Sequence, residues 1–83
     1  MYSKLNFCYE LIGLISKNSN NDDIAQWASD AYLDNLHMHN KDQDLLNMLD
    51  DLRYVSEPGF EISRKRMLQM CNILLNKYID EIK

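Results

Sequence analysis

Glycine and proline are scarce in this sequence, with two glycines and one proline among 83 residues. A many-stranded sheet needs frequent turns, which these two residues supply, and strands favour β-branched and aromatic residues. The chain is instead rich in leucine, methionine, isoleucine and lysine. The composition therefore predicts an all-α fold, a compact bundle of about four amphipathic helices, formed by residues 1–83 as a single domain.

Long apolar runs are also missing. No stretch approaches the roughly 20 consecutive apolar residues of a membrane span. The apolar residues of segment 1–16 are spaced apart, and no cleavage signal of a secreted protein follows them. We therefore expect a cytoplasmic protein with no membrane partner.

Catalytic signatures are absent from the sequence. It holds neither a nucleophile elbow nor a glycine-rich loop that could bind phosphate. Its many carboxylates lie on helix surfaces, where they are rarely desolvated enough for acid–base catalysis. We expect a protein that is not an enzyme and that needs no cofactor.

Metal-binding and disulfide signals are weak. Cys8 and Cys71 each occupy an apolar helical position, which predicts two buried, reduced thiols. His37 and His39 have aspartates nearby, but residues two apart do not share a helix face and no third fixed ligand completes a set. We expect a solvated connection there and no metal.

Four segments carry apolar residues at helical spacing. They predict helices over 3–17, 21–36 and 42–55, and a last, longest helix capped by Ser63. Ser19, Asn20 and Asn21 are all possible caps of the second helix. Gly13 is predicted to mark a close helix crossing. Connections of about 4–8 residues fit an antiparallel bundle or a compact orthogonal array, and both remain open.

Two helices have well-defined apolar faces in this interpretation. The face of the second consists of Ile24, Trp27, Ala28, Ala31 and Tyr32. The broader face of the last consists of Met67, Leu68, Cys71, Leu74, Leu75, Tyr78, Ile79 and Ile82.

Charge is distributed unevenly around a formal net charge of −4. Residues 18–51 hold eight aspartates and one base, Lys41, a net charge of −7, whereas residues 62–83 hold five bases and two acids, a net charge of +3. Aspartate is a poorer helix former than glutamate or lysine, and like charges oppose compaction. This concentration of aspartate is therefore more readily explained by binding than by stability.

The basic run of residues 64–66 is too small to indicate a nucleic-acid surface in a protein of pI about 4.9. We expect it to be solvated and to pair with Glu57 or Glu61. Direct binding of nucleic acid is not expected.

The aspartates form two ridges. At about 100° per residue, Asp23, Asp30 and Asp34 fall within about 40° of one another beside Trp27. On the third helix, Asp44 and Asp51 share an edge with Asn47, and Tyr54 lies on the same outward side. The predicted partner-binding site comprises these residues, namely Asp23, Trp27, Asp30, Asp34, Asp44, Asn47, Asp51 and Tyr54.

Such a site would attract a basic partner and raise its association rate. The simpler alternative is a solvated polar face that happens to use aspartate. For Trp27, the sequence leaves open whether the side chain packs in the core or anchors an interface.

Three segments of the chain resemble a known group of proteins. They are "ISKNSNNDDIAQWASDAYL", "LLNMLDDLRYV" and "RKRMLQMCNILLNKYIDEI", the last preceded by a turn that contains proline. The pattern resembles the small helical, colicin-D-like immunity proteins that accompany polymorphic toxins and contact-dependent growth inhibition toxins. The polar segment that leads into a Trp-Ala pair corresponds here to residues 20–28, and the L-x-x-L helix to residues 45–52. The aspartate-rich connection and the low glutamate content depart from the group.

This resemblance implies a protein that binds a cognate toxin domain, often a nuclease with a basic cleft, in a 1:1 complex as a monomer. Carboxylates would then stand where the phosphates of the substrate bind. The alternative is a small helical adaptor or regulatory module that dimerises through spare apolar residues, namely Leu33, Leu36, Tyr54 and Phe60.

Overall fold

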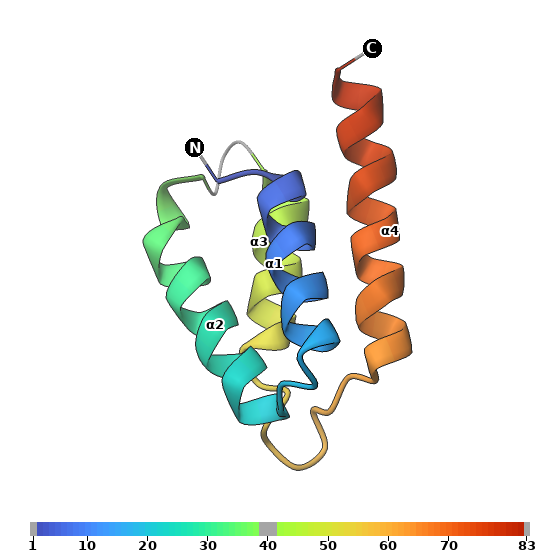
Figure 1. Cartoon of the computed structure of the whole chain (residues 1–83). Helices are drawn as coiled ribbons and strands as arrows, with labels where there is room; N and C mark the ends of the chain where they lie inside the picture. The colour runs from blue at the N-terminus through green and yellow to red at the C-terminus, as the bar shows by residue number, and fades with distance from the viewer. Residues whose placement is uncertain (1, 39–41, 83) are drawn as a thin grey trace.

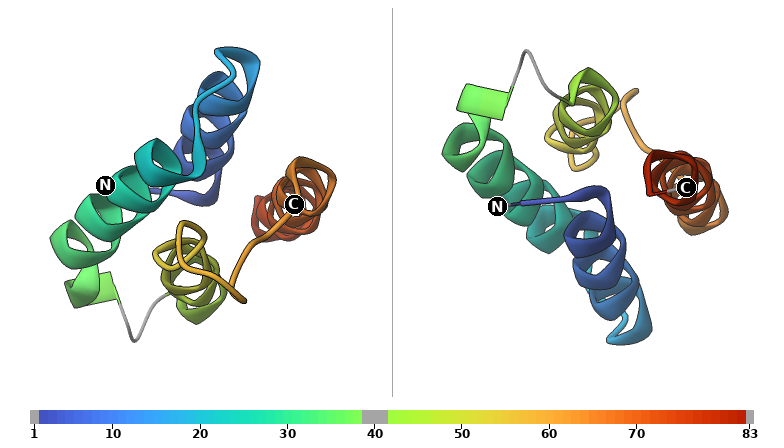
Figure 2. Two further views of the ribbon diagram at one scale, coloured as in Figure 1. Left: turned by 90° about the horizontal axis from the view of Figure 1, so that it is seen from below. Right: turned by 90° about the horizontal axis from the view of Figure 1, so that it is seen from above.

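Four α-helices form most of the computed structural model, which describes residues 2–38 and 42–82. They are α1 (Lys4–Ser16), α2 (Asn21–Asp34), α3 (Gln43–Leu52) and α4 (Arg64–Glu81), and a short 3-10 helix, η1 (Leu36–Met38), follows α2. The described residues contain no strand. Successive helices run in opposite directions (Figure 1) and surround one centre when viewed along their axes (Figure 2). The predicted all-α bundle is confirmed, in its antiparallel form.

Each α-helix begins at a polar side chain that caps it. The capping side chains of Ser3, Asn20, Asp42 and Ser63 each accept a hydrogen bond from the backbone N–H three residues later. Such a bond satisfies one of the backbone donors that a helix start leaves unpaired. Of the three candidates for the second helix, Asn20 is the cap, and Ser63 caps α4 as predicted.

The hydrophobic core draws side chains from every α-helix. Most of its members are aliphatic, with Phe7 as the single fully buried aromatic ring. The buried set is Phe7, Cys8, Leu11, Ile24, Ala25, Ala28, Leu45, Leu46, Leu49, Leu52, Val55, Met67, Met70, Cys71 and Leu74. The predicted apolar face of the second helix is confirmed, because Ile24 and Ala28 are buried and its other members pack against this core.

Two predicted helix ends differ from the structure. The second helix ends at Asp34 rather than at 36, since the chain turns there into η1. The third ends at Leu52, and Val55 reaches the core from the turn that follows. The predicted third helix is too long because Val55 continues the apolar spacing and is buried, although it lies outside the helix.

The predicted apolar face of α4 is partly wrong. Leu68, Ile79 and Ile82 are exposed, while Met70 is buried in their place. One reason is length, because α4 has 18 residues against 13 in α1 and 10 in α3. The C-terminal end of α4 therefore extends past its neighbours (Figure 1).

Cys8 of α1 and Cys71 of α4 are buried, free thiols, as predicted. The Cys8 thiol donates to the carbonyl oxygen of Cys71 over 3.4 Å. Its contact with the Cys71 side chain and its burial raise the pKa of Cys8, which keeps this thiol protonated and unreactive.

Candidate partner-binding site

Trp27 lies at the edge of the core, where α2 meets α1. Its ring packs against Phe7 with 5.6 Å between the ring centroids, and its indole Nε1 donates to Oε1 of Glu10 over 3.0 Å. The side chain is half-buried. Trp27 therefore serves the core with one part of its ring and leaves another part at the surface, so both alternatives for this residue stay open.

Glu10 is held in place by neutral donors. Besides Trp27, the hydroxyl of Tyr2 donates to the same oxygen, Oε1, over 2.9 Å. Burial, together with the hydrogen bond and charge of Glu10, raises the pKa of Tyr2, so this phenol stays a neutral donor. The Glu10 carboxylate is thus oriented without being neutralised.

Two adjoining hollows lie on this side of the molecule. One is acidic, has a volume of about 320 Å³, and is lined by Tyr2, Glu10, Trp27, Asp30 and Asp34. The other is a mainly apolar groove of about 570 Å³, lined by Tyr9, Ile12, Gly13 and Trp27 with Glu10 and Lys17 beside them. Because Glu10 and Trp27 line both, the hollows are neighbours.

Gly13 does not mark a close helix crossing, contrary to the prediction. A Cβ atom placed on it would meet nothing within 4 Å. The reason is the rotation of α1, which points this position into the apolar groove rather than toward another helix.

The structure brings together two of the three aspartates of the first predicted ridge, together with Trp27. Trp27, Asp30 and Asp34 line the acidic hollow beside α1. Asp23 does not line this hollow. It is exposed in the first turn of α2, where the helix dipole stabilises its negative charge.

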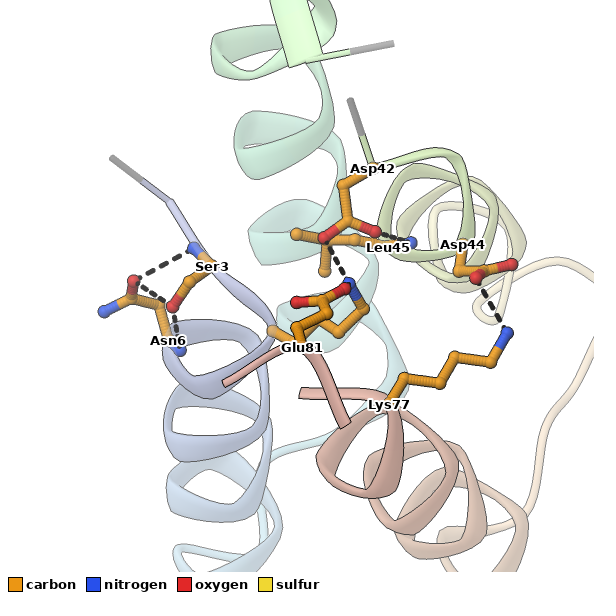
Figure 3. A network of polar contacts seen from close by, with 8 residues as sticks. Ser3, Asn6, Asp42, Asp44, Leu45, Lys77 and Glu81 are labelled. Atoms are coloured by element: carbon orange, nitrogen blue, oxygen red, sulfur yellow. Dashed lines mark hydrogen bonds and ion pairs between the residues drawn. The ribbon is translucent and has the colours of Figure 1, made fainter. Parts of the chain in front are cut away.

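The second predicted ridge faces elsewhere. Asp44 pairs with Lys77 of α4 over 2.7 Å, so this end of the ridge points toward α4 and not toward α1 (Figure 3). Asn47 accepts from the side chain of Gln43, and Asp51 is exposed. Tyr54 is also exposed, and its ring contacts Phe60 and the guanidinium of Arg53. The two ridges therefore do not line one hollow.

Some acidic residues pair with a cation inside the protein, whereas, within residues 2–38 and 42–82, those that line the acidic hollow do not. Asp42, Asp44 and Asp50 are paired with Lys4, Lys77 and Arg53 respectively. Among the residues that the structure describes, no cation pairs with Glu10, Asp30 or Asp34, and Asp30 accepts only from the neutral side chain of Gln26. The carboxylates that line the acidic hollow thus have no cationic partner among the described residues.

Lys4 carries the most buried charge of the described chain. Its side chain is 4% exposed, and its amine pairs with Asp42 over 2.8 Å and with Glu81. The two carboxylates approach it from the start of α3 and the end of α4 (Figure 3). The network therefore ties three helices together and belongs to the fold rather than to the partner site.

Sequence reasoning missed Glu10 and Lys4. Lys4 did carry a signal, because it precedes Cys8 and Leu11 at helical spacing on the buried face of α1. Glu10 carried none, since its role depends on Trp27 of another helix.

The basic run at the start of α4 agrees with the prediction in part, because Lys65 and Arg66 are exposed while Arg64 is half-buried. Arg64 pairs with neither Glu57 nor Glu61, but donates to Asn21 Oδ1 over 2.7 Å and to the Ser19 carbonyl over 2.9 Å. It joins α4 to the connection between α1 and α2.

The described residues contain no group of three metal-ligating side chains, while His39 lies outside them. No helix in the described ranges 2–38 and 42–82 is long and apolar enough to cross a membrane. Comparison of the chain with protein-family models, with curated protein sequences and with solved structures found no match.

Proposed function

We propose that this protein is an immunity protein that binds a basic toxin domain, in the first instance a nuclease, and blocks its substrate cleft. The observation that carries the proposal is the acidic hollow between α1 and α2, where Glu10, Asp30 and Asp34 lack a cationic partner in the described structure. Unpaired carboxylates attract a basic surface over a distance and speed its association.

The other aspartates support this assignment by contrast. Asp42 and Asp44 are each used inside the fold, to hold α1 or α4 against α3. In the described structure Asp30 and Asp34 join no two helices, and Glu10 joins α1 to Trp27 of α2 without a cation, so these carboxylates repel one another. A partner that supplies lysine or arginine would remove this repulsion.

The sequence resemblance supports the same class of partner. The segment that carries the resemblance ends in the Trp-Ala pair of α2, and Trp27 of this pair lines the acidic hollow. In such a complex the carboxylates of this protein would occupy the positions of substrate phosphates. The proposal includes no catalytic role and places the protein in the cytoplasm as a monomer, where its two buried thiols remain reduced.

The proposal predicts that a toxin domain is encoded immediately upstream of this protein, and the test uses that domain. Co-expression of this protein should protect cells from that domain, and the purified pair should form a 1:1 complex. Replacing Asp30 and Asp34 together with asparagine should slow association about tenfold at low salt and flatten its salt dependence, because steering depends on unscreened charge.

A matched control removes two charges outside the hollow instead, with Asp51→Asn and Glu57→Gln, at exposed positions that no ion pair of the described residues uses. This variant has the same net charge as the first. If both variants slow association equally, net charge rather than the acidic hollow governs binding. If the upstream domain is harmless or does not bind, the immunity function itself is rejected.

The adaptor alternative has one specific observation in its favour. Leu33 and Phe60 are 58% and 59% exposed, and Leu36 and Tyr54 are also exposed. Apolar side chains this exposed are common on interaction surfaces, although single ones are also normal on monomers.

A further inference from the structure

Gly13 lies in the interior of α1, and nothing within the protein requires a glycine there. Its backbone has no positive φ, and an added Cβ would meet no atom within 4 Å. Glycine in a helix interior is destabilising relative to alanine. Glycine at this position therefore lowers the stability of α1, and neither the packing nor the backbone conformation of the protein requires it.

The space above Gly13 belongs to the apolar groove. Tyr9 and Ile12 border it from α1, and both are exposed, Tyr9 by 81%. Trp27 borders it from α2. A missing side chain at position 13 deepens the groove down to the helix backbone, so that a large side chain from outside can lie against the tryptophan ring.

Charge restricts what such an occupant carries beside its apolar part. Glu10 and Trp27 line both the groove and the acidic hollow, so a group bound in one lies close to the other. Lys17 lines the groove but not the hollow, so a cation is favoured on the side of the hollow. The hollow adds Asp30 and Asp34, and Glu10 accepts both of its hydrogen bonds on Oε1. No donor of residues 2–38 and 42–82 is bonded to Oε2 of Glu10, which can therefore accept from a guanidinium or ammonium group.

We propose that the groove over Gly13 receives one large apolar side chain of the partner, and that the acidic hollow receives an arginine or lysine next to it. On a partner helix the two would stand about one turn apart, since residues three or four apart share a face. The inference rests on the proposed function in one respect, namely that the occupant of the groove is a side chain of a partner protein.

A second copy of this chain is a poorer occupant. Each copy has a net charge of −4 and presents the same acidic hollow. A basic partner has the complementary charge and avoids like-charge repulsion.

The decisive variant is Gly13→Ala. It should raise the melting temperature, because alanine is the better helix former, and yet weaken binding, because the methyl group fills the floor of the groove. Gly13→Leu should weaken binding further. Asn72→Ala is the matched control, an exposed position of α4 that lines neither hollow, where a somewhat smaller gain in helix propensity should leave binding unchanged.

Two small probes test the groove without a toxin. 4-Phenylbutylguanidine carries a ring and a cation, whereas 4-phenylbutanoate carries the same ring and an anion. Titration is followed by the fluorescence of Trp27, the single tryptophan, and by amide NMR shifts. We expect the cation to bind at least about fivefold more tightly, with shifts centred on Gly13 and Trp27, and Glu10→Gln to narrow the difference.

The inference is overturned if the two probes bind equally, if the shifts lie away from Gly13, or if Gly13→Leu leaves probe affinity unchanged. These outcomes are separable from those of the proposed function. Probe binding without protection from the toxin would reject the immunity function alone, whereas full protection and unchanged toxin affinity in Gly13→Leu would reject the groove alone.

Discussion

Individual carboxylates in this protein differ in what they contact, although their sequence context is similar. Asp42 and Asp44 are two residues apart in the same acidic segment, and each is paired with a lysine of another helix. Asp30 and Asp34 lie in the same segment and face an open hollow beside Glu10. The partner of each side chain decides whether its charge supports the fold or remains available for binding.

Lys4→Met tests the buried amine. The variant keeps most of the apolar stem but leaves Asp42 without its cation, so we expect a loss of about 1–3 kcal/mol in the free energy of unfolding. Denaturant unfolding at neutral pH measures it, and Lys65→Met, at an exposed position of α4, serves as the control. Equal stability of the two variants would contradict a structural role for Lys4.

The contribution of Lys4 should also depend on pH. Burial acts to lower the pKa of its amine, but the hydrogen bonds and charges of Asp42 and Glu81 outweigh burial and raise it above the ordinary 10.5. The unfolded chain therefore loses this proton at a lower pH than the folded protein. Its stabilisation is fully present below about pH 10.5 and is lost as the pH rises through the folded-state pKa. The difference in unfolding free energy between wild type and Lys4→Met should accordingly be constant from pH 7 to 9 and shrink in stronger alkali.

At the scale of the helices, a capping side chain determines where each α-helix begins. Contacts with neighbouring helices determine which of its apolar side chains are buried. The cap at Ser63 starts α4, and the adjacent Arg64 then reaches back to the connection between α1 and α2. The exposed end of α4 shows the opposite case, since Ile79 and Ile82 continue an apolar pattern where no neighbour covers them.

Arg64→Lys should destabilise the protein by about 1 kcal/mol, because an ammonium group cannot make both bonds of the guanidinium fork in the same geometry. Arg66→Lys, at an exposed site two residues on, should change the free energy of unfolding by much less. Thermal or denaturant unfolding of both variants makes the comparison, and similar values would mean that the fork to Ser19 and Asn21 contributes little.

At the scale of the whole molecule, the packing of α1 beside α2 places an apolar groove next to an acidic hollow. The groove beside Gly13 is apolar, and the hollow that adjoins it is acidic. Residues of α1 and α2 line both, and the linings include no member of the network in which Lys4 and Lys77 neutralise aspartates. This separation of structural and free charge suits a monomer that binds a basic partner.

Sedimentation equilibrium should therefore return the monomer mass of 9.8 kDa across the accessible concentration range. A mass that rises with concentration would favour the adaptor alternative. In that case Leu33→Lys and Phe60→Ser should restore the monomer, because a charge or a polar group in an apolar dimer interface is costly.

The sequence by itself determined the helices, their caps and most of the core, because capping and helical periodicity depend on residues within one turn of each other. Ser63 as a cap, the buried Ile24 and Ala28, and the two free thiols all follow from such local patterns. Only the tertiary structure decided that Asp30 and Asp34 line a hollow while Asp44 pairs with Lys77, that Glu10 joins Trp27, and that Gly13 faces open space. These features depend on how the helices rotate and cross, and the residues involved lie far apart in the chain.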